Sequence, residues 1–339
     1  MLLLLGGCAR LGAQESSNAA AIALPTDNDA IFHGGGPEFY QYITRDFKGV
    51  KSTPWEGGQY GFVRDPVETP GGLVYSRFHE GIDIRPMRRD ASGEPLDEVR
   101  AIADGEVVYV NLVPGYSNYG NYVVVEHRWD GGNYYSLYGH LASIAVRAGS
   151  KVTKGQRLGI MGHTGTGLDR ERAHLHLELN LLLSRHFDAW YDHFVKNDPN
   201  RHGLYNGINL AGIDIAKFYL AQHAQPDLSV PRFLEKEHTF YQVTLPATKK
   251  PELTERYPWL LRKTADTTPP SWEISFNRAG VPLKVAPGKT AVAQPIVSFV
   301  EKQAWNYSDL TRGIITGRGK GAHLSESGAR LMQLLIWPD

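Results

Sequence analysis

Short runs of valine, tyrosine and other strand-forming residues dominate the middle of the chain, and glycines separate one run from the next. The clearest runs cover residues 105–110, 121–126, 134–138 and 173–179. β-Branched and aromatic side chains in runs of this length, bounded by turn residues, are typical of strands. The pattern predicts an antiparallel β domain between about residues 71 and 182.

Helical patterns follow this β region. Residues 187–194 and 213–220 are predicted to be partly helical and to cover the sheet. Farther along the chain, strand-like runs at 239–245 and 272–276 precede a predicted helix at 325–335. The expected fold class is therefore mainly β: an antiparallel sheet with a partly helical cover and a C-terminal α+β extension.

The first 70 residues lack such patterns. Residues 14–36 are mostly small and polar and end in three glycines, which predicts a mobile tether. Residues 37–70 mix aromatic residues with glycine and proline, and we expect an irregular segment packed on the following domain. The opening apolar run is too short to span a bilayer, which takes about 20 residues. It ends in Leu5-Gly6-Gly7-Cys8, which resembles the lipobox of bacterial lipoprotein precursors and implies lipid attachment at Cys8; a chance apolar start is the alternative.

Composition excludes several classes of protein. Hydrophobic residues make up 42% of the chain and charged residues 21%, so the chain can bury a core. Basic and acidic residues number 36 each, which removes the strongly basic face of a general nucleic-acid binder. Cys8 is the only cysteine, so an intramolecular disulfide and a cysteine-based zinc cluster are both excluded. A metal site would need histidines and carboxylates.

Four histidines and one aspartate supply that chemistry. His174 and His176 form a His-x-His pair on a predicted strand, and the two-residue period of a strand places both imidazoles on one face. His79 and Asp83 lie upstream, and His140 stands where another predicted strand ends. Zinc accepts nitrogen and oxygen ligands, and a catalytic zinc keeps three protein ligands and one open position. The sequence therefore offers a catalytic zinc site.

Two other motifs resemble known functional motifs but lack residues that those motifs require. The pair His79-Glu80 could begin the helical His-Glu-x-x-His motif, but Asp83 stands where its second histidine would be, and Gly81 disfavours a helix. We therefore treat Glu80 as incidental. The glycine-rich stretch 162–167 lacks the Lys-Ser/Thr of a phosphate-binding loop and is predicted to be a turn between strands.

The order of the motifs resembles the lysostaphin/LytM-type zinc metallopeptidases, which cut peptidoglycan peptides. The resemblance covers about residues 73–182, a third of the chain, and rests on the following segments in sequence order: Arg77-Phe78-His79-Glu80-Gly81-Ile82-Asp83, Ala103-Asp104-Gly105-Glu106-Val107, Tyr119-Gly120-Asn121-Tyr122-Val123, Tyr138-Gly139-His140-Leu141, Gly149-Ser150-Lys151-Val152-Thr153-Lys154-Gly155-Gln156, Gly162-His163-Thr164-Gly165 and His174-Leu175-His176-Leu177-Glu178.

The resemblance implies a role for each of the five residues. His79, Asp83 and His176 would bind Zn²⁺, while His140 and His174 would be the catalytic pair. The chain departs from the family pattern in a longer segment between residues 84 and 99 and at residues 168–173, and both could reshape the groove without removing a ligand.

Glu178 is in phase with the His-x-His pair and could orient one of its imidazoles.

These inferences predict a domain organisation. Residues 1–36 would be a lipoprotein-like signal and linker, and residues 37–70 an irregular segment packed on the catalytic domain. Residues 71–225 would form a LytM-like zinc peptidase domain with its core at 73–182. Residues 231–339 would be a C-terminal domain of unknown role.

The function implied is that of a zinc-dependent metalloendopeptidase of the bacterial cell envelope, periplasmic or extracytoplasmic, that hydrolyses peptide bonds in peptidoglycan stem peptides or cross-bridges. The expected partners are peptidoglycan peptides and not nucleic acid, with membrane attachment through a lipidated Cys8. One alternative is a non-catalytic envelope regulator that activates a cell-wall amidase. Another keeps the zinc and the fold but acts on a different Gly-rich or bacterial peptide.

Overall fold

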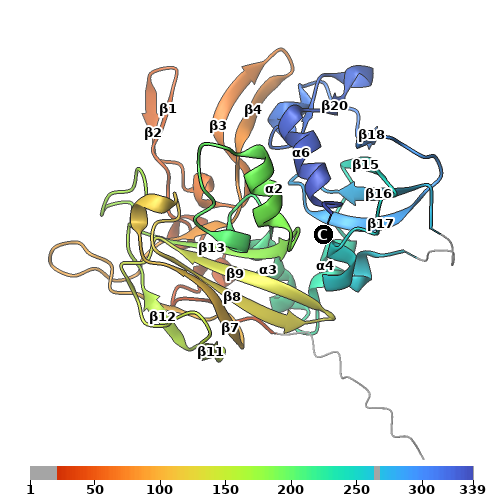
Figure 1. Cartoon of the computed structure of the whole chain (residues 1–339). Coiled ribbons are helices and arrows are strands. Elements are labelled where there is room, and N and C mark those ends of the chain that lie inside the picture. The colour runs from red at the N-terminus through yellow and green to blue at the C-terminus, as the bar shows by residue number, and fades with distance from the viewer. Residues whose placement is uncertain (1–20, 263–267, 339) are drawn as a thin grey trace, which may run out of the picture.

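An antiparallel sheet runs through the computed structural model, which describes residues 21–262 and 268–338 (Figure 1). Residues 1–20, including Cys8 and the lipobox-like segment, lie outside the described residues. The sheet confirms the mainly β prediction. In sheet order its strands are β11 (Lys151–Val152), β7 (Gly105–Asn111), β8 (Tyr122–Trp129), β9 (Gly132–Gly139), β13 (Leu175–Leu182) and β14 (Leu210–Ile213), and β5 (Ile82–Ile84) also pairs with β13.

The two faces of this sheet have different neighbours. One face joins the main hydrophobic core, to which Val123, Tyr138 and Leu177 contribute. The opposite face carries a smaller buried cluster that includes Tyr122 and Leu182. Because side chains alternate along a strand, the even-numbered residues of β13 share a face, from the predicted His-x-His pair to this smaller cluster.

Two hairpins lie in the region expected to be irregular, and residues 21–36 of the expected tether pack on the sheet domain. The hairpins stand side by side in Figure 1 and are formed by β1 (Arg45–Phe47) with β2 (Val50–Ser52) and by β3 (Gly61–Thr69) with β4 (Gly72–His79). The described part of the expected tether packs on the sheet domain: Thr26 and Asn28 are buried, and the amide of Ala23 donates to the carbonyl of Ile102 at 2.7 Å. The hydrogen bonds of these buried polar groups hold the segment on the domain despite its glycine-rich composition.

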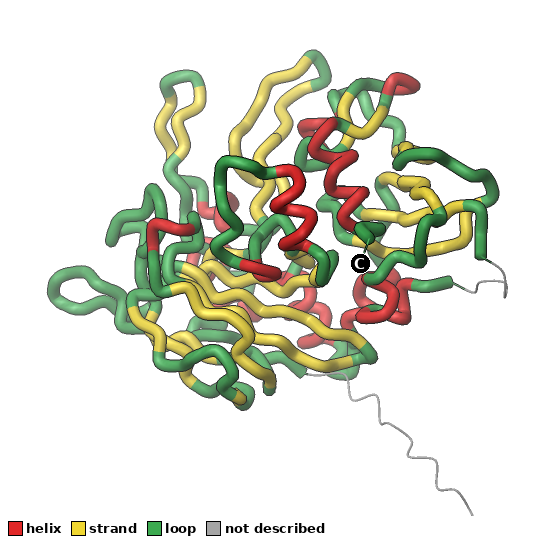
Figure 2. The backbone as a smooth tube through the Cα atoms, in the orientation of Figure 1, coloured by secondary structure: helices red, strands yellow, loops and turns green. Residues whose placement is uncertain are grey.

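Helices cover the sheet where the sequence predicts them (Figure 2). The helix α2 begins and ends at the predicted residues and buries Phe187, Trp190 and Tyr191. At the start of α3, the side chain of Asp214 accepts a hydrogen bond from the amide of Lys217, which satisfies a helix N-terminus. The helices are α1 (Gly36–Phe39), α2 (Phe187–Phe194), α3 (Ile215–Ala224), α4 (Val230–Glu235), α5 (Leu253–Arg256) and α6 (Glu326–Leu334).

The C-terminal region contains a second antiparallel sheet, and its strands and helix α6 give the predicted α+β character. In sheet order its strands are β17 (Pro282–Gly288), β16 (Ser271–Phe276), β15 (Tyr241–Pro246) and β18 (Ile296–Val300). The remaining described strands are β6 (Glu98–Arg100), β10 (Ser143–Ile144), β12 (Arg157–Ile160), β19 (Ile315–Thr316) and β20 (His323–Leu324).

Specific contacts hold this region to the central sheet. The hydroxyl of Tyr257 donates to the carbonyl of Asn133 at 2.6 Å and accepts from the amide of Leu182 at 2.8 Å. Helix α6 lies beside α2, where the indole of Trp190 donates to the carbonyl of Arg330 at 2.8 Å (Figure 1). Within the described residues, no helix is long and apolar enough to cross a membrane.

Candidate metal centre

Strand register brings the five predicted residues together. On β13, His176 lies opposite Asp83 of β5 on one side and opposite Gly139 of β9 on the other. His79 is the last residue of β4, His140 follows the end of β9, and His174 immediately precedes β13. All five predicted side chains are buried. The His-x-His spacing does place both imidazoles on one face.

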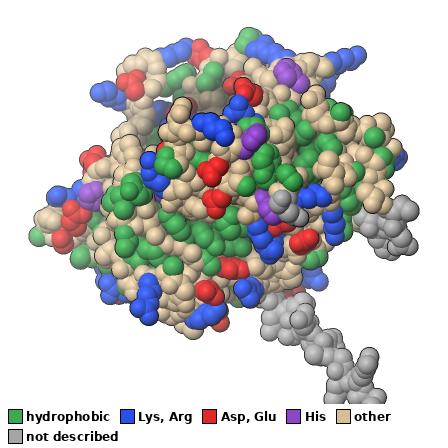
Figure 3. Space-filling model, viewed as in Figure 1, with side chains coloured by type: hydrophobic (Ala, Val, Ile, Leu, Met, Phe, Trp, Pro, Cys, Tyr) green, Lys and Arg blue, Asp and Glu red, His purple; other side chains and the backbone are tan. Residues whose placement is uncertain are grey.

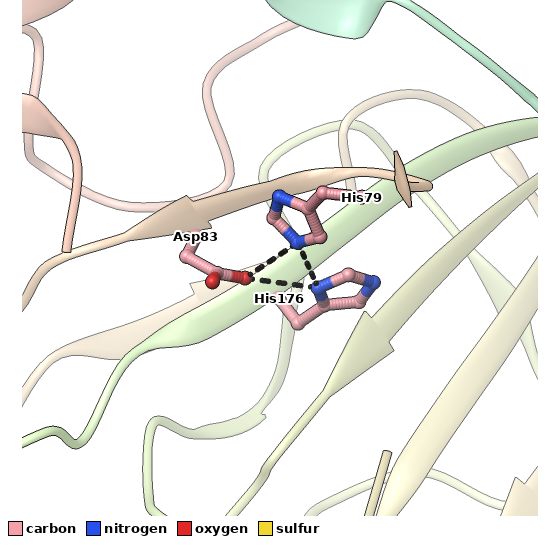
Figure 4. A group of neighbouring side chains, drawn as sticks. All are labelled: His79, Asp83 and His176. Atoms are coloured by element: carbon pink, nitrogen blue, oxygen red, sulfur yellow. Dashed lines mark hydrogen bonds and ion pairs between the residues drawn. The ribbon is translucent and has the colours of Figure 1, made fainter. Parts of the chain in front are cut away.

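Three atoms that could bind a metal ion converge within the site (Figure 4). His79 Nε2 lies 3.0 Å from Asp83 Oδ1 and 3.1 Å from His176 Nδ1, and the last two atoms are 2.9 Å apart. A fourth side chain joins them, since His174 Nε2 lies 3.2 Å from the same carboxylate oxygen. The rings of His140 and His174 are 4.6 Å apart between centroids.

Backbone carbonyls determine which nitrogen of each imidazole faces this centre. His79 Nδ1 lies 2.8 Å from the carbonyl oxygen of Gln59, and a carbonyl can only accept, so Nδ1 carries the proton and Nε2 keeps its lone pair. The same argument holds for His140 beside the carbonyl of Thr164 at 2.8 Å and for His174 beside that of Arg172 at 2.7 Å.

His176 is turned the other way because a carboxylate lies behind it. Its Nε2 donates to Glu178 Oε1 at 2.9 Å, which leaves Nδ1 toward the centre. The other oxygen of Glu178 accepts from Asn180 Nδ2 at 2.9 Å, and the hydroxyl of Tyr119 is a third donor to this carboxylate. Glu178 therefore orients the imidazole as its position on the strand suggested.

The donor set fits a zinc ion. In the metal-binding form, in which His79 and His176 are both neutral, His79 Nε2, Asp83 Oδ1 and His176 Nδ1 are three acceptors that one cation can bind together. Ligands about 2.0–2.2 Å from a tetrahedral zinc lie roughly 3.3–3.6 Å from one another, and the observed separations of 2.9–3.1 Å are slightly shorter.

Burial and charge shift the acidity of the carboxylate and the first imidazole in opposite ways. Burial alone would raise the pKa of Asp83, but its electrostatic interactions with His174, His79 and Arg64 outweigh this and hold that pKa well below its usual value. Burial lowers the pKa of His79, and the neighbouring Asp83 only partly opposes this. The carboxylate is thus ionised and the imidazole is favoured in its neutral, metal-binding form.

The pKa values of His176, a candidate metal ligand, and His140, a candidate general base, shift in opposite directions. Burial lowers the pKa of His176, but its hydrogen bonds to Asp83 and Glu178 reverse the effect and raise the pKa to about 9 in the absence of metal. Burial together with the charges of His174 and His176 holds the pKa of His140 well below its usual value. His140 is therefore neutral at pH 7.

The sequence did not predict that Arg64 contacts Asp83. Its Nη2 lies 2.5 Å from Asp83 Oδ2, the oxygen that faces away from the imidazoles, and its Nε donates to the carbonyl of Gly57 at 2.8 Å. Arg64 lies on β3 just after a bulge, in the region expected to be irregular. No spacing rule links it to the carboxylate, because tertiary packing creates the pair.

His140 has an unusual backbone conformation. Its φ angle is +63°, which side-chain-bearing residues rarely adopt, and its amide donates to the carbonyl of Tyr119 at 2.7 Å. Such strained positions cluster at functional sites.

The two motifs set aside earlier have structural roles. Glu80 lies outside the donor cluster and pairs with Arg312 Nη2 at 2.9 Å. The stretch 162–167 is a loop, and Thr164 within it supports His140 through its carbonyl. Gly120 packs against this loop, since a Cβ at that position would lie 2.3 Å from the Thr164 backbone.

Comparison with known proteins decides the family. Residues 77–188 match the family model described as Peptidase family M23. The chain is 36% identical over 90 residues to Lipoprotein NlpD of Yersinia enterocolitica, a match that spans 26% of this chain and 84% of the relative. The chain belongs to peptidase family M23. All five predicted site residues lie within the M23 match, whereas Arg64 precedes it.

Other M23 relatives have names that point in two directions. The chain is 46% identical over 78 residues to Peptidoglycan DD-endopeptidase ShyA of Vibrio cholerae serotype O1, covering 22% of this chain and 16% of ShyA. It is 37% identical over 102 residues to Murein hydrolase activator NlpD of Escherichia coli, covering 30% of this chain and 22% of that relative. The M23 chain thus spans less than a quarter of the length of these two curated relatives.

Proposed function

We propose that this protein is a zinc-dependent metalloendopeptidase that hydrolyses peptide bonds in the stem peptides or cross-bridges of peptidoglycan. The observation that carries the proposal is the convergence of three lone-pair donors, from His79, Asp83 and His176, beside two further imidazoles. We assign zinc binding to these three residues and catalysis to His140 and His174. The endopeptidase name of one M23 relative supports the substrate class.

The chain's own groups supply the proton transfers. Zinc held by the three ligands would polarise the scissile carbonyl and acidify a bound water. His140 is neutral at pH 7, so its Nε2 can accept the proton of the attacking water. Once one imidazole of the pair is protonated, it can donate a hydrogen bond to the developing oxyanion or a proton to the leaving amine. The carbonyls behind His140 and His174 keep both rings in place for these steps.

Mass spectrometry of purified peptidoglycan after incubation with the zinc-loaded protein tests this function. Chelator-treated protein and a His140→Ala variant are the controls. New peptide products that vanish in both controls would establish the activity and identify the bond. Digestion by His140→Ala at the wild-type rate would refute the assignment.

A second candidate function is supported by the M23 relative named as a murein hydrolase activator. In that case the protein would bind and stimulate a cell-wall amidase without cutting peptidoglycan itself. Stoichiometric zinc together with products in the purified system favours the peptidase. Stimulation of an added amidase by both wild type and His140→Ala, without products from either alone, favours the activator.

We further propose that the protein acts in the bacterial cell envelope and is anchored through Cys8. The lipobox-like segment supports the anchor, and the Lipoprotein NlpD relative supports the compartment. Intact-mass analysis of the membrane fraction tests this, with Cys8→Ser as the control. Unmodified Cys8 in the soluble fraction would contradict the anchor.

A further inference from the structure

A polar pocket opens beside the candidate metal centre. Its walls come from the connection between β7 and β8 and from residues 198–207, which follow α2 and lie beyond the M23 match. Tyr119 belongs to both places, since it lines the pocket and its ring lies 5.3 Å from the His176 ring. We call it the side pocket.

The base of the side pocket is already fixed. His202 is buried there, and the hydroxyls of Tyr109 and Tyr122 lie 3.0 and 2.9 Å from its Nδ1, whose one lone pair they share. Its Nε2 donates to the carbonyl of Tyr116 at 2.9 Å. These bonds tie the segment after α2 to the sheet, so a ligand need not order the pocket on binding.

The wall formed by Gly207 lies close to Tyr119, the residue between the side pocket and His176. A Cβ at Gly207 would lie 3.0 Å from the hydroxyl of Tyr119, the group that also donates to Glu178. A molecule in the side pocket therefore sits one aromatic ring away from the His176 ligand position.

The side pocket presents one positive and one negative side chain together. Arg201 Nη1 lies 2.5 Å from Asp198 Oδ1, and the Arg201 guanidinium lies 5.3 Å from the centroid of the Tyr116 ring. The two charged side chains are 39% and 63% exposed, so each retains surface that can contact a ligand. The two residues are three positions apart in the chain, and their ion pair holds the side chains next to each other.

We propose that the side pocket binds an amino-acid head group that carries both a carboxylate and an ammonium. Arg201 suits the carboxylate, which guanidinium groups bind in a planar, paired geometry, and Asp198 suits the ammonium. A purely anionic ligand would be repelled by Asp198, and a purely cationic one by Arg201, so the pair selects a zwitterion. Resting on the proposed function, the side pocket selects peptidoglycan peptides with a free zwitterionic end close to the bond that is cut.

Binding to the zinc-free full-length protein tests the side pocket without requiring catalysis. The probes are a synthetic stem peptide that ends in a free diamino-acid head group and two matched peptides, one with that amine acetylated and one with that carboxylate amidated. Calorimetry is expected to show at least tenfold weaker binding of each blocked peptide to the wild type. Arg201→Gln should abolish the preference for the free carboxylate, and Asp198→Asn the preference for the free amine.

Lys196→Gln is the matched control, because Lys196 is an exposed charged residue of the same segment and contacts the carbonyl of Asp192. It should keep both preferences. In the zinc-loaded protein, Arg201→Gln and Asp198→Asn should raise KM for the free-ended peptide at least tenfold with kcat unchanged, the signature of lost binding.

Each outcome separates this inference from the proposed function. Equal binding of the three peptides, binding of none, or preferences that survive in both charge variants would overturn the side pocket assignment. Tighter binding of the blocked peptides would point instead to a neutral ligand such as a sugar ring and would also overturn it. Selective binding without any zinc-dependent hydrolysis would leave the side pocket assignment standing and remove the peptidase, whereas hydrolysis without selectivity would do the reverse.

Discussion

Arg64→Met tests whether the arginine behind Asp83 positions the metal-binding carboxylate. The Arg64 side chain is 19% exposed and its partner 3%, with 2.5 Å between Nη2 and Oδ2. Exposed ion pairs contribute about 0–1 kcal/mol, and removing one partner of a fully buried pair costs about 3–5 kcal/mol. Arg64 lies between these limits, so we expect metal-free Arg64→Met to lose about 2 kcal/mol of unfolding free energy.

The same change should weaken zinc binding. Methionine fills similar volume but cannot hold Oδ2, so Asp83 is free to rotate away from the histidines. Loss of a group that orients a ligand typically costs about 10–100-fold in metal affinity. Zinc affinity is measured by competition with a chromophoric chelator, and metal-free stability by urea denaturation. Arg64→Lys, which keeps the charge, should recover part of both losses.

Arg77→Met is the matched control, because Arg77 lies on the paired strand and forms only an exposed contact with Asp65 at 3.8 Å. Its effect on stability should stay within about 0.5 kcal/mol. Zinc affinity in Arg64→Met equal to or tighter than in the wild type would refute the reasoning. It would mean that repulsion between the guanidinium and the metal matters more than orientation of the carboxylate.

Three other changes probe separate features. Glu178→Gln removes the charge behind the third proposed ligand and should lower zinc affinity about tenfold in the same chelator assay; an unchanged affinity would contradict its orienting role. Gly120→Ala places a methyl group against the Thr164 backbone at a φ of +64° and should cost about 1–3 kcal/mol of stability and most of the proposed peptidase activity, whereas Gly115→Ala, with open space around its Cβ, should cost neither. His127 is buried away from the site, and burial lowers its pKa from 6.5 to about 4. Between these two pH values His127 is protonated in the unfolded chain but stays neutral in the folded protein, so protonation favours unfolding. The free energy of unfolding is therefore unaffected by this histidine above about pH 6.5, and up to roughly 3 kcal/mol of it is lost as the pH falls toward 4. Urea denaturation at both pH values should show a smaller loss of stability in His127→Gln than in the wild type, and an identical loss would rule this cause out.

Sequence reasoning reached the parts of the site that local rules control. The two-residue period of a strand was enough to place His174 and His176 on one face, and the motif order brought in Asp83. Arg64 was missed because a bulge in β3 and the packing of a hairpin create its contact. The side pocket was missed because residues 198–207 carry no strand or helix period and acquire their place through a buried histidine. The predicted domain limits at 71–225 and 231–339 stay predictions.

The C-terminal region shares hydrogen bonds with the strand that carries His176. Arg256 donates to the carbonyls of Leu182 and Leu183 at 3.2 and 3.0 Å, next to the bridge that the Tyr257 hydroxyl makes between β9 and β13. Cutting the chain before these residues would strip partners from the end of β13 and expose apolar surface along it. The region therefore acts as part of the scaffold: heating should melt both sheets in a single transition, and a shortened protein that fails to cut peptidoglycan would report on a weakened strand and not on a lost binding module.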